Sequence, residues 1–404
     1  MNGTNSKAKV PKVPPVIKVE SSAPKVIEKF KKLEAVGNAF FLERRDVIHT
    51  GSLAIMTKMH HAQLGEPGTG KSLVVEMFCK SIRGARFFKQ LVGRDMHKDE
   101  LLGTISLKGV TQDEDYRRNV DGMLPTAHVV FLDELGNAGD TLFANLYEVM
   151  NERTMTNGRT RISLPLISLF TGMNYLPQAT AFDALYARIG FRLFVEQMRE
   201  YDNFKQMIRN TETQKEPDTS GVDLTLEDVR AVHQAVPLVV IPDRAIEAMW
   251  EIRKAMNAAG YRVDNRKCVW LLNSVCKAEA LYNGRVEVEE EDLEVLQHCL
   301  WDTPSDRQKV REIVLKVCNP VLEESLKFVD DVQRVIRDGE AFERQSIDRK
   351  ALLSKWLEVN DEITGIIEKV GKRIQETSGR SQQVLLDAAK SIEALHRGVL
   401  ENKL

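Results

Sequence analysis

One short stretch of the sequence carries residue types that define a chemistry, Gly65-Glu66-Pro67-Gly68-Thr69-Gly70-Lys71-Ser72. It fits the pattern G-x-x-x-x-G-K-[ST], which is typical of a loop that wraps nucleotide phosphates. Its glycines permit positive φ angles, so that backbone N–H groups turn inward around an anion. We expect Lys71 to reach the β- and γ-phosphates of a nucleotide, and Ser72 to bind Mg²⁺ at the start of a helix.

Two carboxylates end an apolar run, Val129-Val130-Phe131-Leu132-Asp133-Glu134. The run predicts a buried strand whose carboxyl end lies beside the phosphate loop in an open parallel sheet. Asp133 is then placed to bind the Mg²⁺ shell. Glu134 is placed to orient and polarise the attacking water, so it is the candidate general base.

A polar amide follows a second apolar run. Leu166–Phe170 predicts a strand that continues through Thr171-Gly172-Met173 to Asn174. By itself Asn174 has the character of a turn residue. Together with the phosphate loop and the Asp-Glu strand, it is predicted to hold the attacking water against the γ-phosphate.

The elements that must position these residues follow from periodicity. Between about residues 40 and 196, apolar runs alternate with helical patterns, which predicts an α/β fold with a three-layer α/β/α core and a parallel sheet. The strand expected before the phosphate loop, His60–Leu64, is more polar than a central strand usually is.

Residues 198–303 have only helical patterns, with helices expected from Thr225 to Val236, from Pro242 to Met256, from Asn265 to Tyr282 and after the acidic run 287–292. Residues 304–404 also lack strand signals. There Val359, Ile363, Ile366, Val370 and Ile374 form a heptad-like seam, which favours a helix packed in a bundle over an intermolecular coiled coil.

The predicted domain organisation has four parts. A Lys- and Pro-rich tail is expected at 1–34, either as a solvated arm or as a docking peptide for an acidic partner. The nucleotide-binding core is expected at 35–197, a helical lid at 198–303, and a helical C-terminal domain for partner or oligomer contacts at 304–404.

Composition limits the function classes. The 404 residues carry a formal net charge of −2, which gives no global basic field for nucleic acid. The sequence has no apolar run near the ~18–20 residues that span a bilayer, and no signal-peptide pattern at its start. Five scattered cysteines lack metal-site spacing, so we expect reduced thiols and a cytoplasmic protein.

The order of loop, Asp-Glu strand and Asn-tipped strand resembles an AAA+ ATPase, and more narrowly the MoxR family and its RavA (regulatory ATPase variant) branch. The similarity spans about residues 35–303 and does not include the tail or the last hundred residues. It rests on Gly122-Met123-Leu124-Pro125-Thr126-Ala127-His128, Asn151-Glu152-Arg153, Met173-Asn174-Tyr175-Leu176-Pro177 and Ala184-Leu185-Tyr186-Ala187-Arg188.

The resemblance implies further site residues. Arg188 matches the arginine finger that reaches the neighbouring subunit's γ-phosphate, with Arg192 as the alternative, although the family has Asp-Arg where this chain has Ala187-Arg188. Arg266 matches the lid arginine. The segment that contains Val47 and Ile48 is similar to the family segment that lies along the adenine.

Two predicted insertions also match the family's subgroup, a helix-2 insert at about 101–124 and a β-hairpin at 151–164 around Asn157-Gly158. Both can face the pore of a hexameric ring, where Lys108, Arg159 and Arg161 would touch a substrate. As plain charged loop residues they need no such role.

Three functions remain open. The resemblance favours an ATP-hydrolysing ring, expected to be a hexamer, that remodels a client protein in a chaperone-like role with a von Willebrand A (VWA) type partner. A nucleic-acid-linked motor like the McrB-type ATPases is disfavoured by the missing basic stripe. An ATP-gated scaffold with incidental turnover is disfavoured by the presence of Glu134, since a protein that only binds needs no general base.

Overall fold

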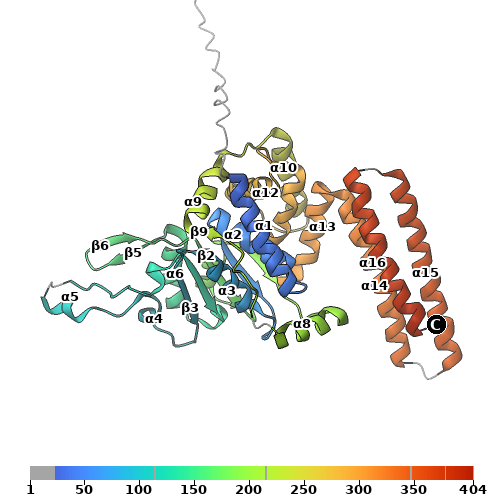
Figure 1. Ribbon diagram of the computed structural model, residues 1–404, viewed down its shortest axis with the longest axis horizontal. Coiled ribbons are helices and arrows are strands. Elements are labelled where there is room, and N and C mark those ends of the chain that lie inside the picture. The colour runs from blue at the N-terminus through green and yellow to red at the C-terminus, as the bar shows by residue number, and fades with distance from the viewer. Residues whose placement is uncertain (1–22, 113–114, 214–215, 346–347, 378, 404) are drawn as a thin grey trace, which may run out of the picture. The chain divides into compact units, whose positions relative to one another are not determined.

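The computed structural model of the chain describes residues 23–112, 115–213, 216–345, 348–377 and 379–403 (Figure 1). Internal packing divides these residues into two compact units. The first contains the described residues up to Ile246 together with Asp264–Pro304. The second contains Glu247–Val263 and the described part of Ser305–Leu404.

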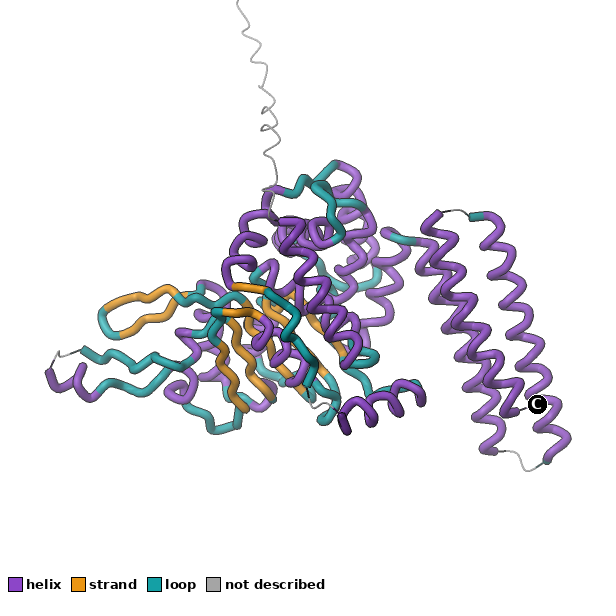
Figure 2. Tube along the Cα trace, viewed as in Figure 1, coloured by secondary structure: helices purple, strands orange, loops and turns teal. Residues whose placement is uncertain are grey.

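A five-stranded sheet forms the centre of the first unit, in the order β3-β4-β7-β1-β8 (Figure 2). All neighbouring pairs are parallel, so the predicted α/β class is confirmed. Parallel order brings the carboxyl ends of β1, β4 and β7 to one edge of the sheet, where the three sequence motifs meet. The strands are β1 (His60–Leu64), β3 (Phe87–Leu91), β4 (Val129–Asp133), β7 (Ser168–Met173) and β8 (Ile189–Phe194).

Specific hydrogen bonds explain why His60 is tolerated in the central strand β1. His60 is buried, and its Nδ1 accepts the Leu169 N–H at 3.0 Å. Its Nε2 lies 3.0 Å from the Met150 carbonyl oxygen and therefore carries the proton that it donates. Burial, assisted by the charge of Arg153, lowers the pKa of His60 to about 3, so the ring is neutral. A neutral histidine with both nitrogens bonded is compatible with a strand that is covered on both faces.

Helix α1 corrects the predicted tail. The tail was expected to reach residue 34, whereas α1 occupies Ala23–Phe40. Val26, Ile27, Phe30 and Leu33 recur at helical spacing and are all buried, which holds this basic segment against the unit. Residues 1–22, the rest of the predicted tail, lie outside the described residues.

The other helices of the core precede, connect or follow its strands. Helices α2 and α3 contact each other, and α2 also contacts β1 and β8. Their bounds are α2 (Arg45–Thr57), α3 (Lys71–Ser81), α4 (Lys98–Leu102), α5 (Leu107–Gln112), α6 (Asp140–Glu152), α7 (Thr180–Tyr186) and α8 (Tyr201–Thr213).

The two predicted insertions lie side by side in Figure 1, as α5 with its flanking loops and as a hairpin of β5 (Thr154–Asn157) and β6 (Thr160–Ser163). The predicted tight turn is present, but its two residues are Gly158 and Arg159, because Asn157 ends β5 and pairs with Thr160. Gly158 has a φ of 62°, which glycine adopts without strain. Hydrogen bonds join the two insertions. Asn157 Oδ1 accepts the Arg118 N–H at 2.6 Å, and Asp115 Oδ1 accepts the Arg159 N–H at 3.1 Å.

The predicted helices after residue 198 are confirmed with two refinements. The capping box at Thr225 and Asp228 begins α9. A π-helical turn interrupts the helix predicted from Asn265 to Tyr282, and the segment after the acidic run is a 3₁₀-helix. The elements are β2 (Ile82–Arg83) paired with β9 (Leu224–Thr225), α9 (Leu226–Ala235), α10 (Asp243–Ala258), α11 (Asn265–Leu271), the π-turn Leu272–Cys276, α12 (Lys277–Tyr282) and η5 (Glu290–His298).

The second unit is helical, as predicted. Trp356, Val359, Ile363 and Val370 are buried in its core, so the heptad-like seam is used inside one chain. Gly339 lets two helices approach, because a Cβ there would lie 3.0 Å from the Trp356 ring. The helices are α13 (Arg307–Cys318), α14 (Pro320–Gln345), α15 (Arg349–Glu376) and α16 (Gly379–Lys403). In the described ranges, none of the helices combines the length and apolar content needed to cross a bilayer.

Candidate nucleotide-binding site

The glycine-rich loop joins β1 to α3 at the carboxyl edge of the sheet. Gly68 and Gly70 have φ angles of 80° and 81°, the left-handed region that glycine adopts without strain. A Cβ at either position would meet no described atom within 4 Å, so this side of the loop is open. Gly65 is required for a different reason, because a Cβ there would lie 2.1 Å from the Val195 carbonyl oxygen.

Lys71 begins α3 and points back across the loop. Its Nζ donates to the carbonyl oxygens of Gly65 at 2.6 Å and Glu66 at 2.8 Å, and to Asn174 Oδ1 at 3.2 Å. Burial lowers the pKa of Lys71, while the charges of Asp133 and Glu134 oppose that shift. The ammonium is therefore held between the loop and the ends of β4 and β7. Ser72 follows it in the first turn of α3 and is half-buried.

The two carboxylates lie where the sequence predicted, at the end of β4. Gly172 on the neighbouring strand makes room for Asp133, because a Cβ at 172 would lie 2.6 Å from Asp133 Oδ1. The same Cβ would lie 3.6 Å from Lys71 Cε, so Asp133 and Lys71 approach the same point of β7. Glu134 has a φ of 56°, an uncommon left-handed conformation for a residue with a side chain.

Two residues that the sequence did not indicate hold the carboxylate of Glu134. Asn137 Nδ2 donates to Glu134 Oε2 at 2.9 Å, and the Tyr175 hydroxyl donates to Asn137 Oδ1, also at 2.9 Å. Tyr175 directly follows Asn174, which contacts Lys71. The segment after β7 therefore contacts both the lysine of the phosphate loop and the partner of the candidate base.

Arg44 fixes the phosphate loop from outside, and sequence reasoning missed it. Its Nε donates to the Thr69 carbonyl oxygen at 3.3 Å, and another nitrogen donates to the Glu196 carbonyl oxygen at 2.8 Å. Burial lowers the pKa of Arg44, and the charges of Glu43 and Glu196 oppose this shift. Glu43 accepts the backbone N–H groups of Arg199 and Glu200, the two residues directly before α8.

The residues predicted to pack on the adenine are buried in α2. Ile48 is 0% exposed and lies beside Gly37 of α1, so it offers no free surface, whereas Val47 is 6% exposed. A cavity of about 50 Å³ lies beside α3, and Phe41 and Leu73 are among its lining residues. Leu73 follows Ser72 and is 42% exposed, which makes it a candidate apolar contact that the sequence did not indicate.

Arg188 lies at the opposite edge of the sheet. It precedes β8, which runs parallel to β1, so the six residues of β8 separate it from the phosphate loop of its own chain. That strand length corresponds to roughly 20 Å. Its Nε donates to Asn151 Oδ1 at 2.7 Å, another nitrogen donates to the Tyr147 hydroxyl at 2.8 Å, and the guanidinium lies 5.1 Å from the Tyr147 ring centroid.

Arg192, the alternative finger, does not fit that role, because its side chain lies inside its own chain. It is 2% exposed and donates to the carbonyl oxygens of Trp301 and Tyr186 and to Asp302. Nearby, burial and then the charge of Arg192 lower the pKa of Lys267 to about 8. Arg192 comes close to residues of the lid only through tertiary packing, and no local sequence pattern predicted these contacts.

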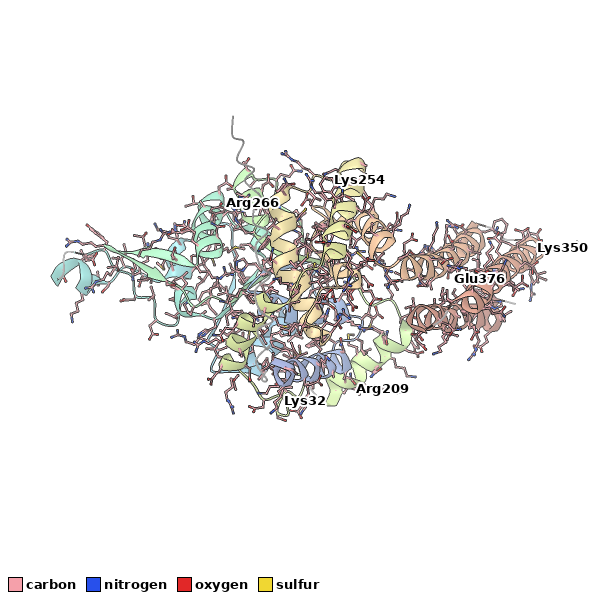
Figure 3. The ribbon with its side chains drawn as sticks, turned by 90° about the horizontal axis from the view of Figure 1, so that it is seen from above. Lys32, Arg209, Lys254, Arg266, Lys350 and Glu376 are labelled. Carbon is pink, nitrogen blue, oxygen red and sulfur yellow. The ribbon has the colours of Figure 1, made fainter. Side chains whose placement is uncertain are left out.

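Arg266, the predicted lid arginine, lies in the first turn of α11 and is exposed (Figure 3). Asp264 begins this helix, since its side chain accepts the Lys267 N–H at 2.8 Å. The structure thus joins Lys71, Asp133, Glu134 and Asn174 at one edge of the sheet, whereas Arg188 lies at the other edge and Arg266 on the lid.

Comparisons with known proteins agree with this arrangement. Residues 28–234 match the family model described as the MoxR domain in the MoxR-vWA-beta-propeller ternary systems. Residues 244–314 match an AAA lid domain.

Two relatives are uncharacterized proteins of Methanocaldococcus jannaschii. MJ0812 is 32% identical over 289 residues, 72% of this chain and 76% of that protein. MJ0079 is 31% identical over 310 residues, 77% of this chain and 80% of that protein.

A solved structure of a candidate ATPase from Cytophaga hutchinsonii has the same fold, with a TM-score of 0.59 at 18% identity, and the match covers 74% of this chain and 96% of that one. The predicted assignment to the RavA branch stays a prediction. The phosphate-loop core, the matching lid and the extent of the family match together place the chain in the MoxR family of AAA+ ATPases.

Proposed function

We propose that the chain hydrolyses ATP to ADP and phosphate, with Mg²⁺, in an oligomeric ring that remodels or activates a client protein. One observation carries the proposal. Lys71, Asp133 and Asn174 come from three separate segments, yet Lys71 Nζ lies 3.2 Å from Asn174 Oδ1, and Lys71 and Asp133 share the space beside Gly172. This grouping gives one cation, one metal-binding carboxylate and one amide around the same phosphate position.

The residues present fit a magnesium–nucleotide complex. Gly68 and Gly70 leave one side of the loop open for phosphate oxygens, and the Lys71 ammonium faces that loop. Ser72 and Asp133 supply the hard oxygen ligands that Mg²⁺ prefers. When bound, Mg²⁺ would neutralise charge on the β- and γ-phosphates. The loop, from Gly65 to Ser72, would hold the phosphates, and its residues are Gly65, Glu66, Pro67, Gly68, Thr69, Gly70, Lys71 and Ser72.

The chain's own residues supply the remaining chemistry. Glu134 takes a proton from the attacking water on its carboxylate, which Asn137 holds by its bond to Oε2. Asn174 orients that water from the neighbouring strand end. Lys71 stabilises the negative charge that is transferred with the phosphoryl group.

Two arginines complete the site in the proposed ring, which we expect to be a hexamer. The position of Arg188, one strand length away from its own phosphate loop, supports a role in the neighbouring subunit's site. Arg266 is the residue that the lid contributes to the site, and it would approach the phosphates as the lid closes. Val47 and Leu73 would contact the adenine. Ile48 is fully buried, so it would support Val47 from behind.

The client and partner follow from features outside the site. The family description names VWA proteins, which supports a VWA-domain partner for this chain. The joined insertions would move together and present Lys108, Arg159 and Arg161 to a protein in the ring's pore. The helices α13 to α16 would recruit partners. The cytoplasmic location stays a prediction.

Calorimetry on the full chain tests the proposal. We expect uptake of ATP or ADP that requires Mg²⁺ and disappears in Lys71→Ala. The Glu134→Gln variant should still bind ATP and should retain client and partner proteins for identification. Magnesium-independent uptake, or uptake unaffected by Lys71→Ala, would contradict the proposal.

A further inference from the structure

The imidazole of His49 lies between carboxylates from two other helices. Its Nδ1 is 3.3 and 3.2 Å from the two carboxylate oxygens of Glu34, and its Nε2 is 2.8 Å from Glu279 Oε2. A neutral imidazole has one N–H, so its second nitrogen would turn a lone pair toward a carboxylate oxygen. With both carboxylates ionised, both contacts are attractive only when both nitrogens donate. The geometry therefore requires an imidazolium.

The surroundings strengthen this ion triad. The side chains of His49, Glu34 and Glu279 are 24%, 8% and 14% exposed, and the Tyr282 ring packs edge-on at 4.8 Å from the imidazole. Burial disfavours the imidazolium, but the hydrogen bonds and charges of Glu279 and Glu34 outweigh it and raise the pKa of His49 to about 10. Burial raises the pKa of Glu279, but the hydrogen bond from His49 and the other partners of this carboxylate lower it by more. The pKa of Glu279 therefore lies below its usual value.

Other charged groups around the triad do not replace its cation. Lys31 of α1 lies 5.7 Å from the centroid of the Tyr282 ring, and Arg285 acts on Glu279 while bonded to Asp292. The positive charge of Arg45 partly offsets the rise in the pKa of Tyr282 that burial causes. Of the cations named here, His49 is the one that hydrogen-bonds both Glu34 and Glu279.

The triad joins three helices, one of which begins directly after the arginine that bonds the phosphate loop. Glu34 belongs to α1, His49 to α2 and Glu279 to α12, which lies within the residues matching the AAA lid. Helix α2 begins directly after Arg44, which donates to the phosphate loop at Thr69. A second contact runs from α2 to the lid, because His298 Nε2 lies 3.8 Å from Asp46 Oδ2.

We infer that His49 is a positioning residue for the ATPase, an imidazolium that fixes the lid onto the helix beside the phosphate loop. The inference rests on the proposed function. Helix α12 continues from α11 through the π-turn, so a shift of Glu279 displaces the start of α11, where Arg266 lies. A displacement of about 1 Å at a site remote from the chemistry can reduce rates by up to about 10²-fold.

The test is the full-length His49→Gln variant, compared with His396→Gln as a matched control. His396 also bonds a side chain, with its Nε2 2.8 Å from Asn360 Oδ1, but it belongs to the helices of the second unit. We expect His49→Gln to lower kcat/KM for ATP about tenfold at a temperature where it is fully folded. His396→Gln should retain wild-type values. Wild-type kcat and KM in folded His49→Gln would reduce His49 to a structural ion pair and overturn the inference.

Two further measurements apply if His49→Gln does not fold. Glu279→Gln should lower kcat/KM more than Glu34→Gln, because only Glu279 lies on the lid; equal values would contradict the inference. In wild-type protein labelled with ¹⁵N-histidine, both nitrogens of His49 should be protonated at pH 8. A neutral ring at that pH would also overturn it.

The outcome can be separated from that of the proposed function. Loss of Mg²⁺-dependent nucleotide uptake in Lys71→Ala tests the function itself. If that loss occurs while His49→Gln keeps wild-type kcat/KM, only the role of His49 fails. If wild-type protein shows no uptake that depends on Lys71, the proposed function fails first.

Discussion

The side-chain amide of Asn137 donates a hydrogen bond to Glu134 Oε2 at 2.9 Å, and its own oxygen accepts from Tyr175 at the same distance. The candidate base is therefore held, through Asn137, by Tyr175, which directly follows Asn174 in the chain. A hydrogen bond to a charged group contributes about 1.5–3 kcal/mol, which corresponds to roughly 10–150-fold in rate if the bond orients the base only during hydrolysis.

We therefore expect Asn137→Ala to lower kcat at least tenfold while the affinity for ATP stays within twofold. Steady-state kinetics and calorimetry on the same preparation measure both quantities. Asn145→Ala is the matched control, since Asn145 is half-buried and its amide donates to the Thr141 carbonyl oxygen of its own helix. An unchanged kcat in Asn137→Ala would show that Glu134 needs no such support.

Replacement of the base itself separates hydrolysis from binding. Glu134→Gln keeps the size of the side chain but removes its ability to take a proton, so we expect kcat to fall by about 10²–10⁴. Binding of Mg²⁺-ATP should persist, because Lys71, Ser72 and Asp133 remain. Single-turnover assays measure the chemical step directly. If client activity survives without turnover, the ATP-gated scaffold becomes the better account.

Arg188 should act between subunits. Its location at the amino end of β8 predicts that ATPase activity per subunit rises with protein concentration and that Arg188→Ala lowers kcat by about 10³ or more. Mixing Arg188→Ala with Lys71→Ala should restore some activity, since each variant supplies what the other lacks. Arg83→Ala is the control, because Arg83 is exposed and pairs with Asp223. Activity per subunit that is independent of concentration would contradict a role in the neighbouring site.

The space at Gly172 should be essential for the metal site. A methyl group there would lie 2.6 Å from Asp133 Oδ1, so Gly172→Ala must displace that carboxylate. We expect at least a tenfold rise in the Mg²⁺ concentration needed for nucleotide binding, measured by titration of the metal. Gly93→Ala is the comparison, because a Cβ there meets no described atom within 4 Å. Normal Mg²⁺ dependence in Gly172→Ala would mean that Asp133 is not a ligand.

The His49 triad predicts how stability changes with pH. The pKa of His49 is raised from 6.5 to about 10 on folding, so the native state binds the proton more tightly than the unfolded state. The stabilisation is complete below pH 6.5 and is lost as the pH rises to about 10, by at most ~1.4 kcal/mol per pH unit. Melting temperatures between pH 6.5 and 10 should therefore fall less in His49→Gln than in the wild type. Parallel curves for the two proteins would show that the ring is not charged.

Local sequence was enough for the parts of the site that lie in contiguous residues. The loop from Gly65 to Ser72 and the Asp133-Glu134 pair each depend on neighbours in the chain, so their spacing predicts their conformation. The alternation of strands and helices predicted the parallel sheet for the same reason, and that sheet brings Asn174 to Lys71.

The tail boundary shows where local reasoning failed, and the polar strand β1 shows what it predicted but could not explain. Charge and prolines near the start of the chain obscured the apolar positions of α1, which gain their partners only when the unit packs. His60 looked out of place in a central strand because its two hydrogen-bond partners, Leu169 and Met150, are about a hundred residues away.

The sequence by itself determined that the chain has a phosphate loop, two carboxylates and a sheet to bring them together. Only the tertiary structure decided which groups support them: Asn137 and Tyr175 behind Glu134, Arg44 behind the phosphate loop, and His49 between α1 and the lid. These contacts join side chains from separate segments. Their partners depend on packing across the fold, which no local spacing of residue types encodes.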